Sequence, residues 1–212
     1  MLIVAWEVTA ACNLACSYCR ASACVKPDSD ELSTEEALSF LDEVATLHPL
    51  LILSGGEPIL RPDIFRLARH AAGLGLRVSL ASNGTTITPQ VADEIAQSGI
   101  SRVSISLDAA NARGHDSMRG QGSFDQAMQG IKCLSGKVDF QINYTVSGRN
   151  ECDAKGMFDL AERLGARALH FFFLVATGRG SEADLLSAQK QEEILLEIDR
   201  LHDARDIEVQ VT

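Results

Sequence analysis

The sequence contains no cluster of basic residues and no apolar run long enough to cross a bilayer. Its 212 residues include 19 lysines and arginines against 29 aspartates and glutamates, which gives a formal net charge of −10. This charge argues against a nucleic-acid or anionic-membrane partner. The apolar-rich run at residues 2–8 is too short for a spanning helix and follows no charged leader. We therefore expect a cytoplasmic protein.

Internal repeats and Pro/Ser-rich linkers are also lacking, so no boundary divides the chain. Hydrophobic residues make up 46% of it and charged residues 23%, enough for a sizeable core, and we expect one domain over residues 1–212. A disulfide framework is not expected. The six cysteines gather toward the start of the chain, which favours metal binding in a reducing compartment.

The chain does contain a regular alternation of short apolar runs and longer amphipathic segments, which is typical of parallel βα units. The predicted strands are residues 2–8, 50–53, 76–81, 101–107, 138–146, 168–175 and 207–211. The predicted helices begin at the capping box of Ser33 and Glu36, near Pro62, at Thr88, at Ser123, at residue 153 and at residue 187. A full eight-fold barrel needs about 250 residues. We therefore expect an α/β fold, a partial (βα)6 TIM-like barrel with parallel strands.

Several predicted strands carry polar side chains on one face. Gln141, Asn143 and Thr145 alternate with apolar residues, and Ser79 and Ser104 do the same on earlier strands. Helices must cover the apolar face of such strands, so the polar face should point into the barrel. Because buried polar groups need partners, this pattern indicates a polar ligand inside the barrel.

Three cysteines, Cys12, Cys16 and Cys19, follow the first predicted strand with the spacing Cys-x3-Cys-x2-Cys. Structural zinc sites and iron–sulfur electron carriers normally take four protein ligands. Three thiolates leave one metal position open for another ligand. The alternatives to a three-cysteine site with an open position are a zinc site, or a four-cysteine cluster completed by Cys24. A second motif, Gly55-Gly56-Glu57-Pro58, follows the second strand; taken alone it is as readily a tight turn as a ligand site.

Together these two motifs resemble the signature of radical S-adenosylmethionine (AdoMet) enzymes. Further segments make the chain most similar to the SPASM/twitch-type subgroup and, within it, to tetrapyrrole-modifying members of the alternative haem synthase and haem d1 biosynthesis type. Those segments are residues 6–9, 19–23, 104–108, 140–143 and 172–180. The sequence departs from the family pattern at Ala109-Ala110, where glycine is usual, and at Ser17, where many tetrapyrrole members have a basic residue.

The resemblance implies a radical SAM core with two cofactors, a [4Fe–4S] cluster and S-adenosyl-L-methionine. In this family, reductive cleavage of AdoMet at the cluster gives a 5′-deoxyadenosyl radical, which abstracts hydrogen from the substrate. The resemblance also implies that Cys12, Cys16 and Cys19 ligate iron. The implied cofactor-binding residues are Tyr18, Gly55, Gly56, Glu57, Asn83, Ser106, Asp108 and Arg119, the last as a carboxylate clamp. Valine at Gly56 is expected to weaken AdoMet binding and to spare the cluster.

Three functions stay open at this point. The first is tetrapyrrole maturation in haem biosynthesis, such as propionate decarboxylation, with a reductant such as flavodoxin or ferredoxin. The second is maturation of a peptide or redox cofactor. The third, from another class, is a non-catalytic iron–sulfur electron carrier. Candidates for binding substrate carboxylates, or else ordinary surface arginines, are Arg113, Arg119, Arg149 and Arg179, all at predicted loop positions. The residues interpreted as structural are Cys133 and Cys152, both in predicted helices, and His170.

The last residues, 207–212, alternate like a strand, and no helix or further cysteine follows them. An uncovered terminal strand is an exposed edge, which proteins tend to avoid. We therefore expect either a catalytic core cut from a longer protein or a shortened member without the C-terminal auxiliary-cluster segment. Such a core is expected to bind one [4Fe–4S] cluster and to cleave AdoMet slowly.

Overall fold

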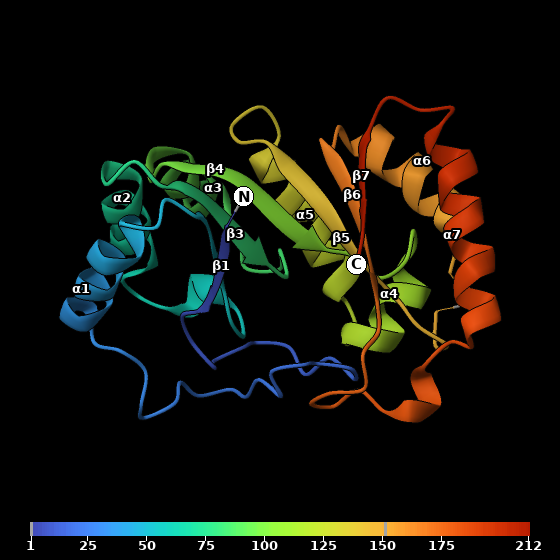
Figure 1. Cartoon of the computed structure of the whole chain (residues 1–212), viewed down its shortest axis with the longest axis horizontal. Helices are drawn as coiled ribbons and strands as arrows, with labels where there is room; N and C mark the ends of the chain where they lie inside the picture. The colour runs from blue at the N-terminus through green and yellow to red at the C-terminus, as the bar shows by residue number, and fades with distance from the viewer. Residues whose placement is uncertain (1, 151) are drawn as a thin grey trace.

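Seven parallel strands, paired in chain order, form one curved sheet in the computed structural model, which describes residues 2–150 and 152–212. The strands are β1 (Ile3–Glu7), β2 (Leu50–Ser54), β3 (Arg77–Ser82), β4 (Ile100–Ser106), β5 (Phe140–Val146), β6 (Ala168–Phe173) and β7 (Glu208–Val211). Within the described residues no pairing joins β1 to β7, so the sheet is a half-barrel with an open side (Figure 1). The predicted partial barrel of parallel strands is confirmed.

Helices cover the convex face of the sheet and leave its concave face toward the opening (Figure 1). The helices on the convex face are α1 (Thr34–Ala45), α2 (Ile64–Gly73), α3 (Pro89–Gln97), α5 (Ser123–Leu134), α6 (Ala154–Leu164) and α7 (Ala188–His202). Helix α4 (Ala112–Arg119) lies at the carboxyl ends of the strands, and there are two short 3-10 helices, η1 (Pro58–Leu60) and η2 (Glu182–Asp184). Leu41, Leu67 and Ile95 are fully buried between helices and sheet. Burying each such side chain contributes about 1.5–3 kcal/mol. In the described part of the chain no helix is long and apolar enough to cross a membrane.

Strand β5 shows why the two faces of the sheet differ. Phe140, Ile142 and Tyr144 are at most 3% exposed, whereas Gln141 and Asn143 between them are half-buried on the concave face. The predicted alternation of this strand is therefore confirmed. The concave face offers polar side chains to whatever fills the half-barrel.

One prediction about the segment near residue 120 is wrong. Residues 112–119 form α4 where a loop was expected, because Asn111 caps the helix with its side-chain oxygen. Helix α5 begins at Ser123 as predicted, but its N-cap is Gly122. The carboxylate of Asp116 satisfies the helix start by accepting from the amides of Gly122 (2.7 Å) and Phe124 (2.9 Å).

Several side chains in and after this region lie on elements other than those predicted for them. Arg113 and Arg119 lie on α4 and not on a loop. Cys133 lies in α5 as expected, but Cys152 precedes α6 and is not helical. Both cysteines are half-buried against the hydrophobic core.

Candidate functional site

The loop after β1 carries the three motif cysteines and lies where the strands of the half-barrel end (Figure 1). An isolated pairing of Ala11 with Cys24 closes its base. The amide of Cys12 donates to the carbonyl oxygen of Cys24 (2.7 Å), and the amide of Cys24 donates to that of Ala10 (3.2 Å). Both ends of the cysteine loop are therefore fixed by backbone hydrogen bonds.

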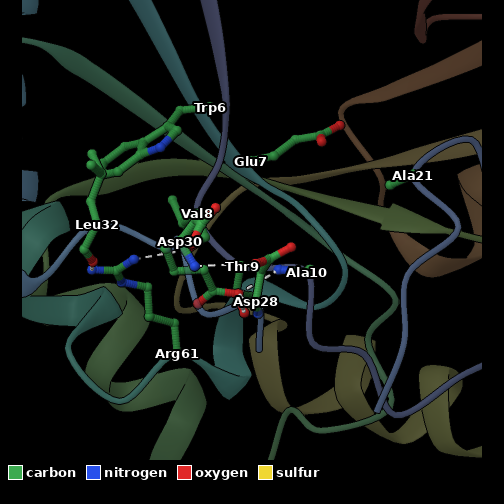
Figure 2. Close-up of a pocket in the computed structure, with 11 residues that line it drawn as sticks. Trp6, Glu7, Val8, Thr9, Ala10, Ala21, Asp28, Asp30, Leu32 and Arg61 are labelled. Atoms are coloured by element: carbon green, nitrogen blue, oxygen red, sulfur yellow. Dashed lines mark hydrogen bonds between the residues drawn. The ribbon is translucent and has the colours of Figure 1, made fainter. Parts of the chain in front are cut away.

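Arg61 supports the start of this loop from behind, beside a cavity of about 300 Å³ (Figure 2). Its buried guanidinium donates to the carbonyl oxygens of Val8 and Leu32, both at 2.8 Å. It also lies 6.0 Å from the centre of the Trp6 ring. The sequence analysis missed Arg61, since its partner Val8 is 53 residues away and no local pattern joins them.

Glu31 fixes the same segment with one carboxylate oxygen. That oxygen accepts from the hydroxyl of Thr9 and the amide of Ala10, both at 2.8 Å, and from the amide of Asp28 at 3.0 Å. Three donors on one acceptor tie the beginning of the cysteine loop to its return. Glu31 was also missed, because an isolated acidic residue in a loop carries no pattern of its own.

The three thiols share one region of the loop. Cys12 and Cys16 are buried, and Cys19 is half-buried. The sulfur of Cys12 accepts from the amide of Leu14 and that of Cys19 from the amide of Ala23, both at 3.4 Å. Burial raises the pKa of the Cys12 and Cys16 thiols, and the nearby charge of Cys19 raises both further. Amide donors aimed at sulfur suit thiolate ligands.

These thiols do not form a site for one ion. Among residues 2–150 and 152–212, no group of three or more His, Cys, Asp or Glu side chains is gathered around a single metal position. Cysteine thiolates are the ligands that iron–sulfur clusters take in proteins, so the chemistry of this donor set fits such a cluster. Cys24 is exposed, and its thiol donates to the carbonyl oxygen of Lys26 (3.1 Å).

A segment after β6 closes over the cysteine loop. The Arg179 side chain donates to the carbonyl oxygens of Cys16 (2.9 Å) and Ala23 (2.8 Å), and its amide donates to that of Cys19 (2.9 Å). A Cβ atom at Gly178 would lie 2.3 Å from the Cys19 carbonyl oxygen. Arg179, a candidate for substrate carboxylates, is thus engaged in holding the loop.

The turn after β2 packs directly on the cysteine loop. The amide of Gly56 donates to Thr9 O (2.7 Å) and that of Glu57 to Ala11 O (2.8 Å). A Cβ atom would lie 2.3 Å from Thr9 O if added at Gly55, and 2.3 Å from Ala11 O if added at Gly56. Glycine is required because the two backbones touch. The expectation that valine at Gly56 spares the cluster no longer holds, since the side chain would displace the loop.

Glu57 is completely buried and ties this turn to the end of β3. Its carboxylate accepts from the Ser82 hydroxyl (2.9 Å) and the Asn83 amide (2.7 Å). Burial raises the pKa of Glu57 to about 7. The side-chain nitrogen of Asn83 donates to Asn13 (2.9 Å) and lies 3.9 Å from the sulfur of Cys12. Two of the predicted site residues, Glu57 and Asn83, therefore meet beside the first cysteine.

Asp108, Arg119 and Tyr18 form a buried cluster under the loop. The Tyr18 hydroxyl donates to Asp108 (2.5 Å), and the Arg119 guanidinium donates to both partners. Burial opposes the charge of Arg119, but the Asp108 carboxylate outweighs it and raises the pKa of the guanidinium well above its usual value. The predicted carboxylate clamp is thus occupied by a carboxylate of the protein itself. The cap at Asn111 and the glycine at Gly120 are the signals that predict this helix and its arginine.

The remaining candidates lie apart from this cluster. Ser106 ends β4 on the concave face, in register with Asn143 of β5. Arg113 is exposed on α4. Arg149, which is partly exposed, donates to the buried carboxylate of Asp184 (2.6 Å). The structure does not bring the four candidate arginines to one place.

A sequence profile described as the radical SAM superfamily matches residues 6–161. The chain is 49% identical over 197 residues to the AdoMet-dependent heme synthase of Methanosarcina barkeri, covering 91% of this chain and 56% of that protein. It is 38% identical over 184 residues to the mycofactocin maturase MftC of Mycolicibacterium smegmatis, covering 85% of this chain and 46% of that protein. The chain spans about half the length of these relatives.

Among solved structures, Streptococcus suis SuiB bound to S-adenosylmethionine matches with a TM-score of 0.85 at 14% identity, covering 100% of this chain and 50% of that one. At this identity the likeness concerns the fold, the half-barrel of parallel strands. Radical SAM proteins bind a [4Fe–4S] cluster and AdoMet. Since the profile covers most of the chain and a heme synthase is 49% identical to it, the chain belongs to the radical SAM superfamily.

Proposed function

We propose that residues 1–212 are a radical SAM catalytic core that acts on a tetrapyrrole in haem biosynthesis, with decarboxylation of propionate side chains as the reaction. The 49% identity with a heme synthase over 91% of the chain carries this proposal. The polar concave face supports it, because that face needs a polar occupant.

The cysteine loop is proposed to hold the [4Fe–4S] cluster through Cys12, Cys16 and Cys19. When bound, the cluster and AdoMet supply a one-electron reduction that cleaves the sulfonium and a hydrogen abstraction from the substrate. The protein's own part is positioning. Arg61, Glu31 and the pairing at the loop base keep the cysteines in place before any ligand arrives.

The proposed AdoMet site is made of the ends of consecutive strands. Residues 55–57 follow β2, Asn83 follows β3, and Ser106 ends β4. The close contact between the Gly56 turn and the cysteine loop holds the proposed methionine-binding turn against the residues that would ligate the cluster. Asp108 and Arg119 act through Tyr18, which they hold between the second and third cysteines.

Anaerobic reconstitution tests this proposal. Iron and sulfide analysis should give about four irons per chain, and about eight would indicate a second cluster. Adding AdoMet should change the EPR spectrum of the reduced cluster and yield 5′-deoxyadenosine. A spectrum that AdoMet leaves unchanged would favour the electron-carrier alternative. Loss of carboxyl groups from iron-coproporphyrin III tests the substrate.

Peptide or redox-cofactor maturation is the second candidate, favoured by the 38% identity with a mycofactocin maturase over 85% of the chain. The same reduced protein would be incubated with AdoMet and candidate precursor peptides. A mass change in a peptide, with no change in the porphyrin, would support this candidate over the first.

A further inference from the structure

An ion pair spans the concave face of the half-barrel from β4 to β7. Arg102 Nη1 lies 2.9 Å from Glu208 Oε2, although 106 positions separate the two residues and two strands lie between theirs. Both side chains project from the concave face, since their neighbours Val103 and Val209 pack against the core on the helix side. Glu208 is in register with Ala168 of β6, a small residue under the bridge.

Water reaches both partners of this pair. The side chain of Arg102 is 30% exposed and that of Glu208 is 61% exposed. An ion pair of this kind adds little to stability, because water competes for both charges. The buried pair of Asp108 and Arg119, at 0% and 9% exposure, is different. Arg102 can therefore exchange Glu208 for another carboxylate at small cost.

A stacked aromatic pair lies on the same face, nearer the carboxyl ends of the strands than the ion pair. The rings of His170 and Phe172 stack with their centres 3.8 Å apart and 30° between their planes. In register with His170 are Asn143 of β5 and Gln210 of β7. The concave face thus presents a stacked aromatic pair, whose ring edges and outer face stay free to contact a planar ligand, flanked by amide hydrogen-bonding groups.

The distance along β4 indicates the size of ligand that fits. Arg102 precedes Ser106, at the end of the strand, by four residues. A rise of about 3.3 Å per residue places Arg102 about 13 Å from the end of the strand where the cysteine loop lies. A large planar molecule can reach from Arg102 to that end, whereas a small metabolite cannot.

We propose that Arg102 is the carboxylate-recognition residue of the substrate site, and that Glu208 occupies it until a substrate carboxylate takes its place. The substrate is a planar ring system bearing carboxylates, with its ring against His170 and Phe172 and one carboxylate on Arg102. Guanidinium binds carboxylate through two parallel hydrogen bonds, which lysine cannot reproduce. This inference rests on the proposed function and assigns the substrate-binding part of the interior.

The test is an absorbance titration of the reconstituted protein with iron-coproporphyrin III. Arg102→Gln and Glu208→Gln are compared with Arg69→Gln and Glu94→Gln. The control pair joins α2 to α3 on the outer face, with a separation of 3.2 Å and 50% exposure of both side chains. It matches the charge changes of the test pair but lies on the opposite side of the sheet.

Arg102→Gln should weaken porphyrin binding by about tenfold or more. Glu208→Gln should bind at least as tightly as the wild type, because it frees Arg102. The control variants should not differ from the wild type. The tetramethyl ester of the same porphyrin, which has no carboxylates, should bind to the wild type and Arg102→Gln alike. Arg102→Lys keeps the charge and should recover only part of the affinity.

Two results would overturn the inference. One is an Arg102→Gln variant that binds the porphyrin as Arg69→Gln does. The other is a Glu208→Gln variant that loses as much affinity as Arg102→Gln, which would make the pair a structural contact. AdoMet cleavage is measured in every variant, so the proposed function is judged separately. A wild type that cleaves AdoMet and binds no porphyrin would contradict the proposed substrate itself.

Discussion

Replacing Arg119 with methionine should destabilise the protein strongly, because the carboxylate of Asp108 would stay buried without its cation. The two side chains are 9% and 0% exposed, so water cannot take over the role of the guanidinium. Removing one partner of a buried ion pair costs about 3–5 kcal/mol. The hydrogen bonds from the Tyr18 hydroxyl and the Thr145 amide remain, so we expect the lower end of this range.

In a chain of this size, about 3 kcal/mol lowers the unfolding midpoint by about 6–12 °C. The assay is thermal unfolding of the cluster-free chain under reducing conditions, followed by far-UV circular dichroism. Arg69→Met is the control, since its half-exposed pair is worth at most about 1 kcal/mol. The double variant Asp108→Leu with Arg119→Met removes both charges and should recover much of the loss. If Arg119→Met unfolds at the temperature of the control, the reasoning about this buried pair fails.

Alanine at any one of the three motif cysteines should abolish cluster assembly. Cys24→Ala should retain the cluster, because the Cys24 thiol is exposed and donates to Lys26. Iron and sulfide analysis of each variant measures the outcome. Gly56→Ala should also prevent cluster assembly, since its Cβ would lie 2.3 Å from a carbonyl oxygen of the cysteine loop. Gly73→Ala is the control: its Cβ would meet open space, so the protein should be unaffected or stabilised by up to about 1 kcal/mol. Burial raises the pKa of Glu57 from 4.5 to about 7, so the folded state retains a proton that the unfolded chain releases. Stability of the cluster-free chain should then fall by roughly 3 kcal/mol as the pH rises through this window, and Glu57→Gln should lose this dependence in urea unfolding at about pH 5 and about pH 8.

Where local sequence determines local structure, the sequence was sufficient. The alternation in β5 predicted which side chains face the helices, because the strand period forces neighbours to opposite faces. The capping box of Ser33 and Glu36 predicted the start of α1, since both hydrogen bonds form within one turn. The cysteine motif and the glycine turn were likewise visible, each within a few residues.

Contacts between distant segments could not be predicted in the same way. The pair of Arg102 and Glu208 depends on how far the sheet curves, which no single strand reveals. Arg119 was recognised as a carboxylate partner, but its partner Asp108 belongs to the protein. The reason for Gly56 was also misjudged, because close approach to a ligand and close approach to another loop require the same residue.

The backbone pairing of Ala11 with Cys24 has a consequence for how iron is taken up. The pairing joins the two ends of the cysteine segment and closes it into a loop. The entropy cost of closing this loop therefore arises during folding and not when the cluster binds. The segment can still open locally while the sheet stays intact, by breaking the two backbone hydrogen bonds at its base together with the contacts of Glu31 and Arg179. Loading the cluster should then slow hydrogen exchange at the amides of Cys12 and Cys24 far more than at those of β5, a strand that is paired on both sides within the sheet.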